Sequence, residues 1–135
     1  DFAGAVLKYL RRHPVPRLTI CGGVGKLSKL ADGHLDLHSG RSQVNKDLLA
    51  EIVRTAGGGS DLAESVRTAN TALGALHLCQ AAAFPLGDLI AARARAVARD
   101  VLREAPVEVD VVVIDRAGTI VGRTPFAQSR QRVVE

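Results

Sequence analysis

The stretch RLTICGGVGKLSKLADGHLDLHS, residues 17–39, joins a short strand pattern to a glycine-rich turn and then to a polar segment. A strand that runs into Gly-Gly-x-Gly is how α/β folds bring their backbone close to a nucleotide-like ligand. Glycine permits a positive φ and leaves no Cβ in the path of that ligand. We therefore expect Gly22, Gly23 and Gly25 to bind a nucleotide-like cofactor, with a ligand-free turn between a strand and a helix as the alternative.

Two known phosphate-binding motifs do not account for this turn. Gly25 and Lys26 are adjacent, as in a P-loop, but Leu27 stands where that motif needs Ser or Thr. Ile20 occupies the place of the first P-loop glycine. The dinucleotide-binding fingerprint also fails, because the third glycine is out of register. Neither motif is therefore assigned.

The polar segment places His34, Asp36 and His38 at alternate positions. In an extended segment these side chains would lie on one side. Three interpretations are open: loop histidines bonded to backbone, an Asp–His pair for proton transfer, and a metal site with Cys21 as third ligand. Leu35 rules out an HExxH motif, and a closed zinc site lacks convincing third and fourth ligands. On spacing alone the first interpretation is favoured, the Asp–His pair stays open, and we expect no metal.

Apolar residues recur at helical spacing on both sides of this stretch. The expected helices cover residues 2–12, 45–55, 60–83 in two pieces, and 86–105. Asn45 and Ser60 are the expected N-caps, and Pro85 and Pro106 end helices. Asn70-Thr71, at a helix boundary, is expected as a cap first and as a ligand contact second. His77 is expected at the edge of the core.

The expected strands cover residues 17–21, 107–115 and 119–122. The second becomes a continuous apolar run, which predicts burial on both faces. The RAGT sequence that follows predicts a hairpin, and we assign Asp115 to its turn rather than to a ligand site. Strands with helices between them predict the α/β class. We expect a Rossmann-like domain with about three strands and four or five helices.

The composition predicts one cytoplasmic globular domain. The 135 residues fit a single domain with a modest core, and no apolar run approaches the roughly 20 residues that span a bilayer. The two cysteines are too few for a disulfide scaffold and suit a reducing compartment. Because the chain holds no methionine, we expect it to be a piece of a longer protein.

The net charge of +4 favours an anionic partner. Nucleic acid is a poor candidate, because the chain has no Trp, one Tyr and three Phe for base stacking. It also shows no helix-turn-helix or zinc-finger spacing. We expect a polyanionic small molecule as the partner and no membrane, and a homo-oligomer stays open.

The run GGVGKLSKLADGHLDLHSGRSQV, residues 22–44, resembles the signature of the cobalt-precorrin-5B C(1)-methyltransferases, the CbiD family of cobalamin biosynthesis. That signature joins a glycine turn to GK-x-x-K-L-A-x-G and then to His-x-Asp-x-His-Ser. ANTAL, residues 69–73, and LGDLIAARAR, residues 86–95, are similar to downstream segments of the family. The resemblance implies a cytoplasmic enzyme of the anaerobic pathway. It would move a methyl group from S-adenosylmethionine to carbon 1 of an anionic cobalt-tetrapyrrole.

The resemblance also implies that residues 1–135 are the C-terminal half of a longer enzyme whose N-terminal half is absent. We expect this half to fold alone without turnover. The expected catalytic residues are His34, Asp36 and His38, and the expected cofactor-binding residues are Gly22, Gly23 and Gly25. The expected substrate-binding residues are Lys26, Lys29, Ser39, Arg41 and Asn70. The alternatives are a non-catalytic tetrapyrrole- or nucleotide-binding module and a nucleotide-binding domain with an unrelated substrate.

Overall fold

The structure of the protein is a computed structural model that describes residues 2–35 and 44–124. In chain order its elements are α1 (Phe2–Arg12), β1 (Arg17–Gly23), α2 (Val24–Ala31), α3 (Lys46–Thr55), α4 (Ser60–Arg67), α5 (Ala72–Ala81), α6 (Leu86–Leu102), β2 (Glu108–Ile114) and β3 (Ile120–Arg123). The expected α/β class is confirmed. The described residues form six helices rather than four or five.

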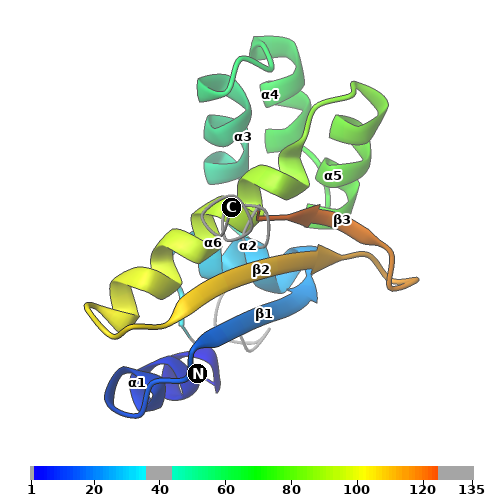
Figure 1. Cartoon of the computed structure of the whole chain (residues 1–135). Helices are drawn as coiled ribbons and strands as arrows, with labels where there is room; N and C mark the ends of the chain where they lie inside the picture. The colour runs from blue at the N-terminus through cyan, green and yellow to red at the C-terminus, as the bar shows by residue number, and fades with distance from the viewer. Residues whose placement is uncertain (1, 36–43, 125–135) are drawn as a thin grey trace, which may run out of the picture.

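The three strands make one mixed sheet in the order β1-β2-β3 (Figure 1). β1 runs parallel to β2, with Arg17 opposite Glu108 and Gly23 opposite Ile114. β3 returns antiparallel to β2 through the expected hairpin. The expected strand boundaries are correct to within two residues, whereas the Rossmann-like label is not confirmed.

Among the described residues, helices cover one face of this sheet. On that face Val109, Val111 and Val113 of β2 are fully buried. On the other face β1 exposes alternate residues, Cys21 among them, and Ile120 of β3 is 51% exposed. The expected burial of β2 on both faces is therefore wrong. On its uncovered side β2 carries Glu108, Asp110, Val112 and Ile114, of which Asp110 is buried and the others are half-buried.

The longest helix, α6, organises the helical layer. It packs on β2, β3, α1 and α2, and Ile90, Ala94 and Ala98 on its inner side are fully buried. Arg11 Nη1 ties α1 to α6 by donating to the Val101 carbonyl at 3.1 Å. α3, α4 and α5 stand together to one side of the sheet (Figure 1). No helix in the described ranges combines the length and the apolar character needed to cross a membrane.

Local sequence signals set several helix boundaries. Asn45 caps α3 as expected, because its side chain accepts a hydrogen bond from the first turn of the helix at 3.0 Å. Thr71 caps α5 in the same way. The segment 60–83 divides into α4 and α5, as expected. The expected cap at Ser60 is wrong: Ser60 is the first helical residue, and the N-cap is Gly59, whose φ of 93° favours glycine.

α2 was not among the expected helices, although the ligand-free alternative placed a helix after the glycine-rich turn. This helix begins directly after the glycine-rich turn and spans eight residues, and Leu27 and Leu30 on its inner side are almost fully buried. Gly22 makes room for it, because a Cβ at that position would lie 2.6 Å from Leu27 Cδ2. Part of the glycine-rich turn therefore serves helix packing rather than a ligand.

Candidate functional site

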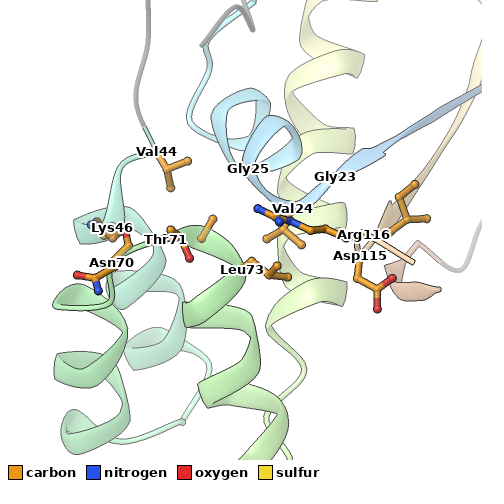
Figure 2. Close-up of a pocket in the computed structure, with 12 residues that line it drawn as sticks. Gly23, Val24, Gly25, Val44, Lys46, Asn70, Thr71, Leu73, Asp115 and Arg116 are labelled. Carbon is orange, nitrogen blue, oxygen red and sulfur yellow. Dashed lines mark hydrogen bonds between the residues drawn. The ribbon is translucent and has the colours of Figure 1, made fainter. Parts of the chain in front are cut away.

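A cavity of about 560 Å³ opens at the carboxyl ends of the parallel strands β1 and β2. This is the edge at which open α/β sheets bind ligands. Its walls come from the β1–α2 turn, the end of β2, and the starts of α3 and α5 (Figure 2). The cavity therefore joins segments that are far apart in the sequence.

The wall formed by the β1–α2 turn is made largely of backbone. Gly23 is the N-cap residue of α2, and Gly25 lies in its first turn. A Cβ built on either glycine would meet no atom within 4 Å, so both positions border open space. The first turn of α2 holds no acidic residue, and within the described part of the chain no side chain caps it. The free N–H groups of this turn favour a negatively charged ligand group.

The opposite wall joins the start of α3 to the start of α5. Lys46 Nζ donates to the carbonyl oxygens of Ala69 at 2.7 Å and Asn70 at 3.4 Å. Thr71 Oγ1 accepts from the Gly74 N–H at 2.9 Å. Figure 2 shows Lys46, Asn70 and Thr71 together at one end of the cavity. This end offers amide, hydroxyl and ammonium groups for hydrogen bonding.

The turn after β2 forms the remaining wall. Asp115 Oδ1 accepts from the N–H groups of Ala117 and Thr119, both at 2.9 Å. Asp115 is therefore a turn residue, as expected, although it also lines the cavity. From the same turn, the side chain of Arg116 extends toward the start of α2, where its nitrogens lie beside Val24 (Figure 2).

An apolar middle separates the two polar ends of the cavity. Val24 and Leu73 lie between the backbone of Arg116 on one side and Lys46 on the other, and the side chain of Arg116 extends to Val24 (Figure 2). Apolar walls with a few polar groups are typical of small-molecule sites. The arrangement fits an elongated ligand with polar groups at both ends, and the cations favour a negative charge on it.

Some of the predicted site residues meet at this cavity. The predicted residues that line it are Gly23, Gly25 and Asn70. Gly22 does not line it and instead packs against Leu27. Lys26 is exposed and Lys29 is only 7% exposed, and neither belongs to the lining.

The predicted catalytic residue His34 lies at the opposite end of α2. Its N–H donates to the Lys29 carbonyl at 3.0 Å, and its Nε2 lies 3.2 Å from Asp32 Oδ2. A helix of eight residues is about 12 Å long, so the length of α2 separates His34 from the glycine wall. The other predicted residues of this segment, Asp36, His38, Ser39 and Arg41, fall outside the described residues.

The described ranges contain no cluster of three or more His, Cys, Asp or Glu residues that could hold a metal ion. Cys21, which we considered as a metal ligand, is an exposed residue of β1. His77, which was expected at the edge of the core, is exposed on α5.

Sequence patterns missed the cavity residues Lys46, Leu73 and Arg116. Lys46 and Leu73 carried no signal, because they look like ordinary residues of a helix start. Arg116 did carry one: it follows Asp115 at the end of a buried strand, where α/β sheets bind ligands. Thr71, which was expected as a cap first and as a ligand contact second, caps α5 and also lines the cavity.

A family model described as the C-terminal domain of CbiD matches residues 36–125. This chain belongs to the CbiD family. The match includes the cavity walls from α3, α5 and the end of β2, whereas β1 and α2 precede it. Because β1 pairs with β2 along its whole length, the sheet of this CbiD domain includes a strand from outside the match.

Relatives with the name cobalt-precorrin-5B C(1)-methyltransferase agree with this family. The protein from Burkholderia mallei is 56% identical over 125 residues, which cover 93% of this chain and 34% of the relative. The protein from Brucella ovis is 53% identical over 91% of this chain and 33% of the relative. The protein from Rhodospirillum rubrum is 55% identical over 90% of this chain and 34% of the relative. The chain thus spans about a third of the length of these curated relatives. No solved structure matches it.

Proposed function

We propose that this chain is part of a cobalt-precorrin-5B C(1)-methyltransferase and that its cavity binds the methyl donor, S-adenosylmethionine. The relatives' names support the activity. The observation that carries the assignment of the donor site is the open space beside Gly23 and Gly25 at the carboxyl ends of β1 and β2. A nucleotide-like molecule needs such a close approach to the backbone, and about 560 Å³ is a usual volume for a small-molecule site.

The groups that line the cavity fit the parts of this donor. Asn70 and Thr71 can hydrogen-bond to ribose hydroxyls or to the base, and Val24 and Leu73 can contact the apolar middle of the molecule. When bound, the donor supplies an electrophilic methyl group. The chain itself has to bind and align, because methyl transfer needs an in-line approach and no protein nucleophile.

The acceptor in this proposal is a cobalt-tetrapyrrole of the anaerobic cobalamin pathway in the cytoplasm. Such a molecule carries several carboxylates, for which Lys26 is an exposed cation next to the glycine wall in sequence. Ser39 and Arg41 stay predictions for the same role. Lys29 is mostly buried, so it is the less accessible of the two lysines.

We further propose that His34, Asp36 and His38 act on the acceptor rather than on the donor. The position of His34 supports this, because α2 separates it from the glycine wall. In the longer enzyme, His34→Gln is expected to lower kcat while the affinity for the donor changes less than about twofold. A donor affinity that falls together with kcat would contradict this division of roles.

The remaining part of the parent enzyme, the longer protein to which this chain would belong, is our proposed partner for the uncovered face of the sheet. The curated relatives are about three times as long as this chain, so they hold enough polypeptide to cover it. The face offers Cys21 and Ile120, which are exposed in the described chain. A tetrapyrrole site between the two parts would explain why this chain alone should not turn over.

Calorimetry on the 135-residue chain and a methyl-transfer assay on the parent enzyme test the proposal together. The chain is expected to bind S-adenosylhomocysteine, the product form of the donor, and the parent enzyme to methylate the cobalt-tetrapyrrole. Binding of a corrinoid alone, with no activity of the parent, would favour a non-catalytic tetrapyrrole-binding module. Binding of neither molecule would leave a nucleotide-binding domain with an unrelated substrate.

A further inference from the structure

The β2–β3 turn holds the backbone of Arg116 in place. The Asp115 carboxylate accepts from the N–H groups of Ala117 and Thr119, both at 2.9 Å, and the Gly118 N–H donates to the Asp115 carbonyl at 3.1 Å. Gly118 has a φ of 85°, a conformation that favours glycine. The backbone position of Arg116 is therefore set by the protein and does not depend on a ligand.

The guanidinium of Arg116 has no partner within the described residues. Its neighbour Asp115 cannot neutralise it easily, because Oδ1 of that carboxylate is held by the turn and the two side chains point in different directions (Figure 2). The guanidinium nitrogens lie beside Val24, at the start of α2. The first turn of this helix also has no side-chain cap and no acidic residue. An unpaired guanidinium and unpaired N–H groups thus border the same end of the cavity.

We propose that Arg116 binds a carboxylate of the ligand and that this end of the cavity is a carboxylate-binding subsite. A guanidinium gives a carboxylate two parallel hydrogen bonds, which an ammonium group cannot do. The inference rests on the proposed function, under which two ligands carry carboxylates: the amino-acid end of the donor and the side chains of the tetrapyrrole. The donor is the favoured source, because the glycine wall lies at the same end of the cavity.

This orientation would place the rest of the donor along the apolar middle of the cavity. Its adenosine would then reach the opposite end, beside Asn70, Thr71 and Lys46. Arg116 would act as a specificity residue, because it distinguishes donors with the amino-acid end from nucleosides without it.

Titration calorimetry of two nucleosides against the 135-residue chain tests the subsite. S-adenosylhomocysteine carries the carboxylate, and methylthioadenosine lacks the whole amino-acid end. Arg116→Gln is expected to weaken S-adenosylhomocysteine at least about tenfold, as for loss of a charged hydrogen bond, and methylthioadenosine less than about twofold. Arg116→Lys should restore only part of the loss. Arg99→Gln, on the exposed side of α6, is the matched control and should change neither affinity.

A second set of titrations measures the affinity of a corrinoid that bears free carboxylates and of its fully amidated form. Each corrinoid is titrated against the unaltered chain and against Arg116→Gln. A loss confined to the free carboxylates in Arg116→Gln would support the subsite and assign it to the acceptor. Equal losses for all ligands, or no loss for any ligand that carries a carboxylate, would overturn it. If the unaltered chain binds neither nucleoside, the proposed donor site fails, and the corrinoid titrations alone decide whether Arg116 binds a carboxylate.

Discussion

Gly87 of α6 and Gly122 of β3 pack backbone against backbone. A Cβ built on Gly122 would lie 2.2 Å from the Gly87 carbonyl carbon, and one built on Gly87 would lie 2.0 Å from the Val121 carbonyl oxygen. Beside this contact, Asp88 Oδ1 accepts from the Arg123 N–H at 2.9 Å. The start of α6 is thus fixed on β3, and β3 continues the sheet whose edge forms the cavity.

Gly122→Ala is expected to destabilise the fold, because the added methyl group would meet backbone that cannot rotate away. Overpacking of this kind costs roughly 1–3 kcal/mol, sometimes more. Gly25→Ala is the matched control, since its methyl group enters open space and alanine favours a helix over glycine by up to about 1 kcal/mol. Chemical denaturation measures the change in the free energy of unfolding for both variants. Equal midpoints for Gly122→Ala and the unaltered chain would show that this contact is not tight.

Lys46→Met is expected to loosen the wall between α3 and α5. The ammonium group donates to the Ala69 carbonyl at 2.7 Å, across the loop that carries Asn70. Its loss should lower the free energy of unfolding by about 1 kcal/mol and weaken donor binding through the displaced loop. Lys8→Met, at an exposed position of α1, should change neither. If Lys46→Met leaves the affinity for the donor unchanged, Lys46 does not contribute to the donor site.

The two cysteines are expected to react at very different rates. Cys21 is exposed and Cys79 is fully buried, and burial raises the pKa of the Cys79 thiol from 9.0 to about 11. At pH 8, thiol-specific alkylation followed by mass spectrometry should label Cys21 at least about a hundredfold faster, because only the thiolate reacts. Comparable rates in the folded chain would contradict the burial of Cys79.

The same shift predicts a pH dependence of stability. The folded state keeps the Cys79 proton to about pH 11, whereas the unfolded chain loses it near 9.0. The unfolded state therefore binds fewer protons between these values, and the free energy of unfolding should fall as the pH rises through them. Cys79→Ala should show a shallower fall than the unaltered chain in denaturation series at pH 8 to 11. Parallel curves would contradict the shifted pKa.

Cys21 also reports on the proposed parent enzyme. If the rest of that enzyme covers the uncovered face of the sheet, Cys21 should become slow to alkylate in the longer protein, while Cys79 stays slow in both. Equal labelling of Cys21 in the chain and in the parent would leave that face open and contradict the proposed contact.

Local patterns predicted the elements whose signals lie within a few residues. Asn45 and Thr71 are caps that any helix of this kind would use, and the strand from Arg17 was visible as an apolar run between prolines and glycines. The burial of β2 could not be read in the same way. Its continuous apolar run is typical of a strand covered on both faces, whereas helices cover only one face among the described residues.

The site was predictable only in part. Gly23 and Gly25 could be identified, because glycines after a strand have a known use at a sheet edge. α2 was not among the expected helices, so the separation that it imposes between His34 and the glycines could not be predicted. Lys46 is brought to the cavity by contacts between distant segments, which no local pattern predicts, whereas Arg116 could have been predicted from its place after a buried strand.

The central claim is that the space beside Gly25 belongs to the methyl donor, and a size series at that position tests it most directly. The affinity of the 135-residue chain for S-adenosylhomocysteine would be measured by calorimetry for Gly25→Ala and Gly25→Val. Ser65→Val, on the exposed side of α4, is the control for adding valine to a helix surface. We predict a graded loss, with Gly25→Val weaker by at least about a hundredfold, while denaturation midpoints show that both variants stay folded. An unchanged affinity in folded Gly25→Val would contradict the claim, because a donor in this cavity could not share the space with the new side chain.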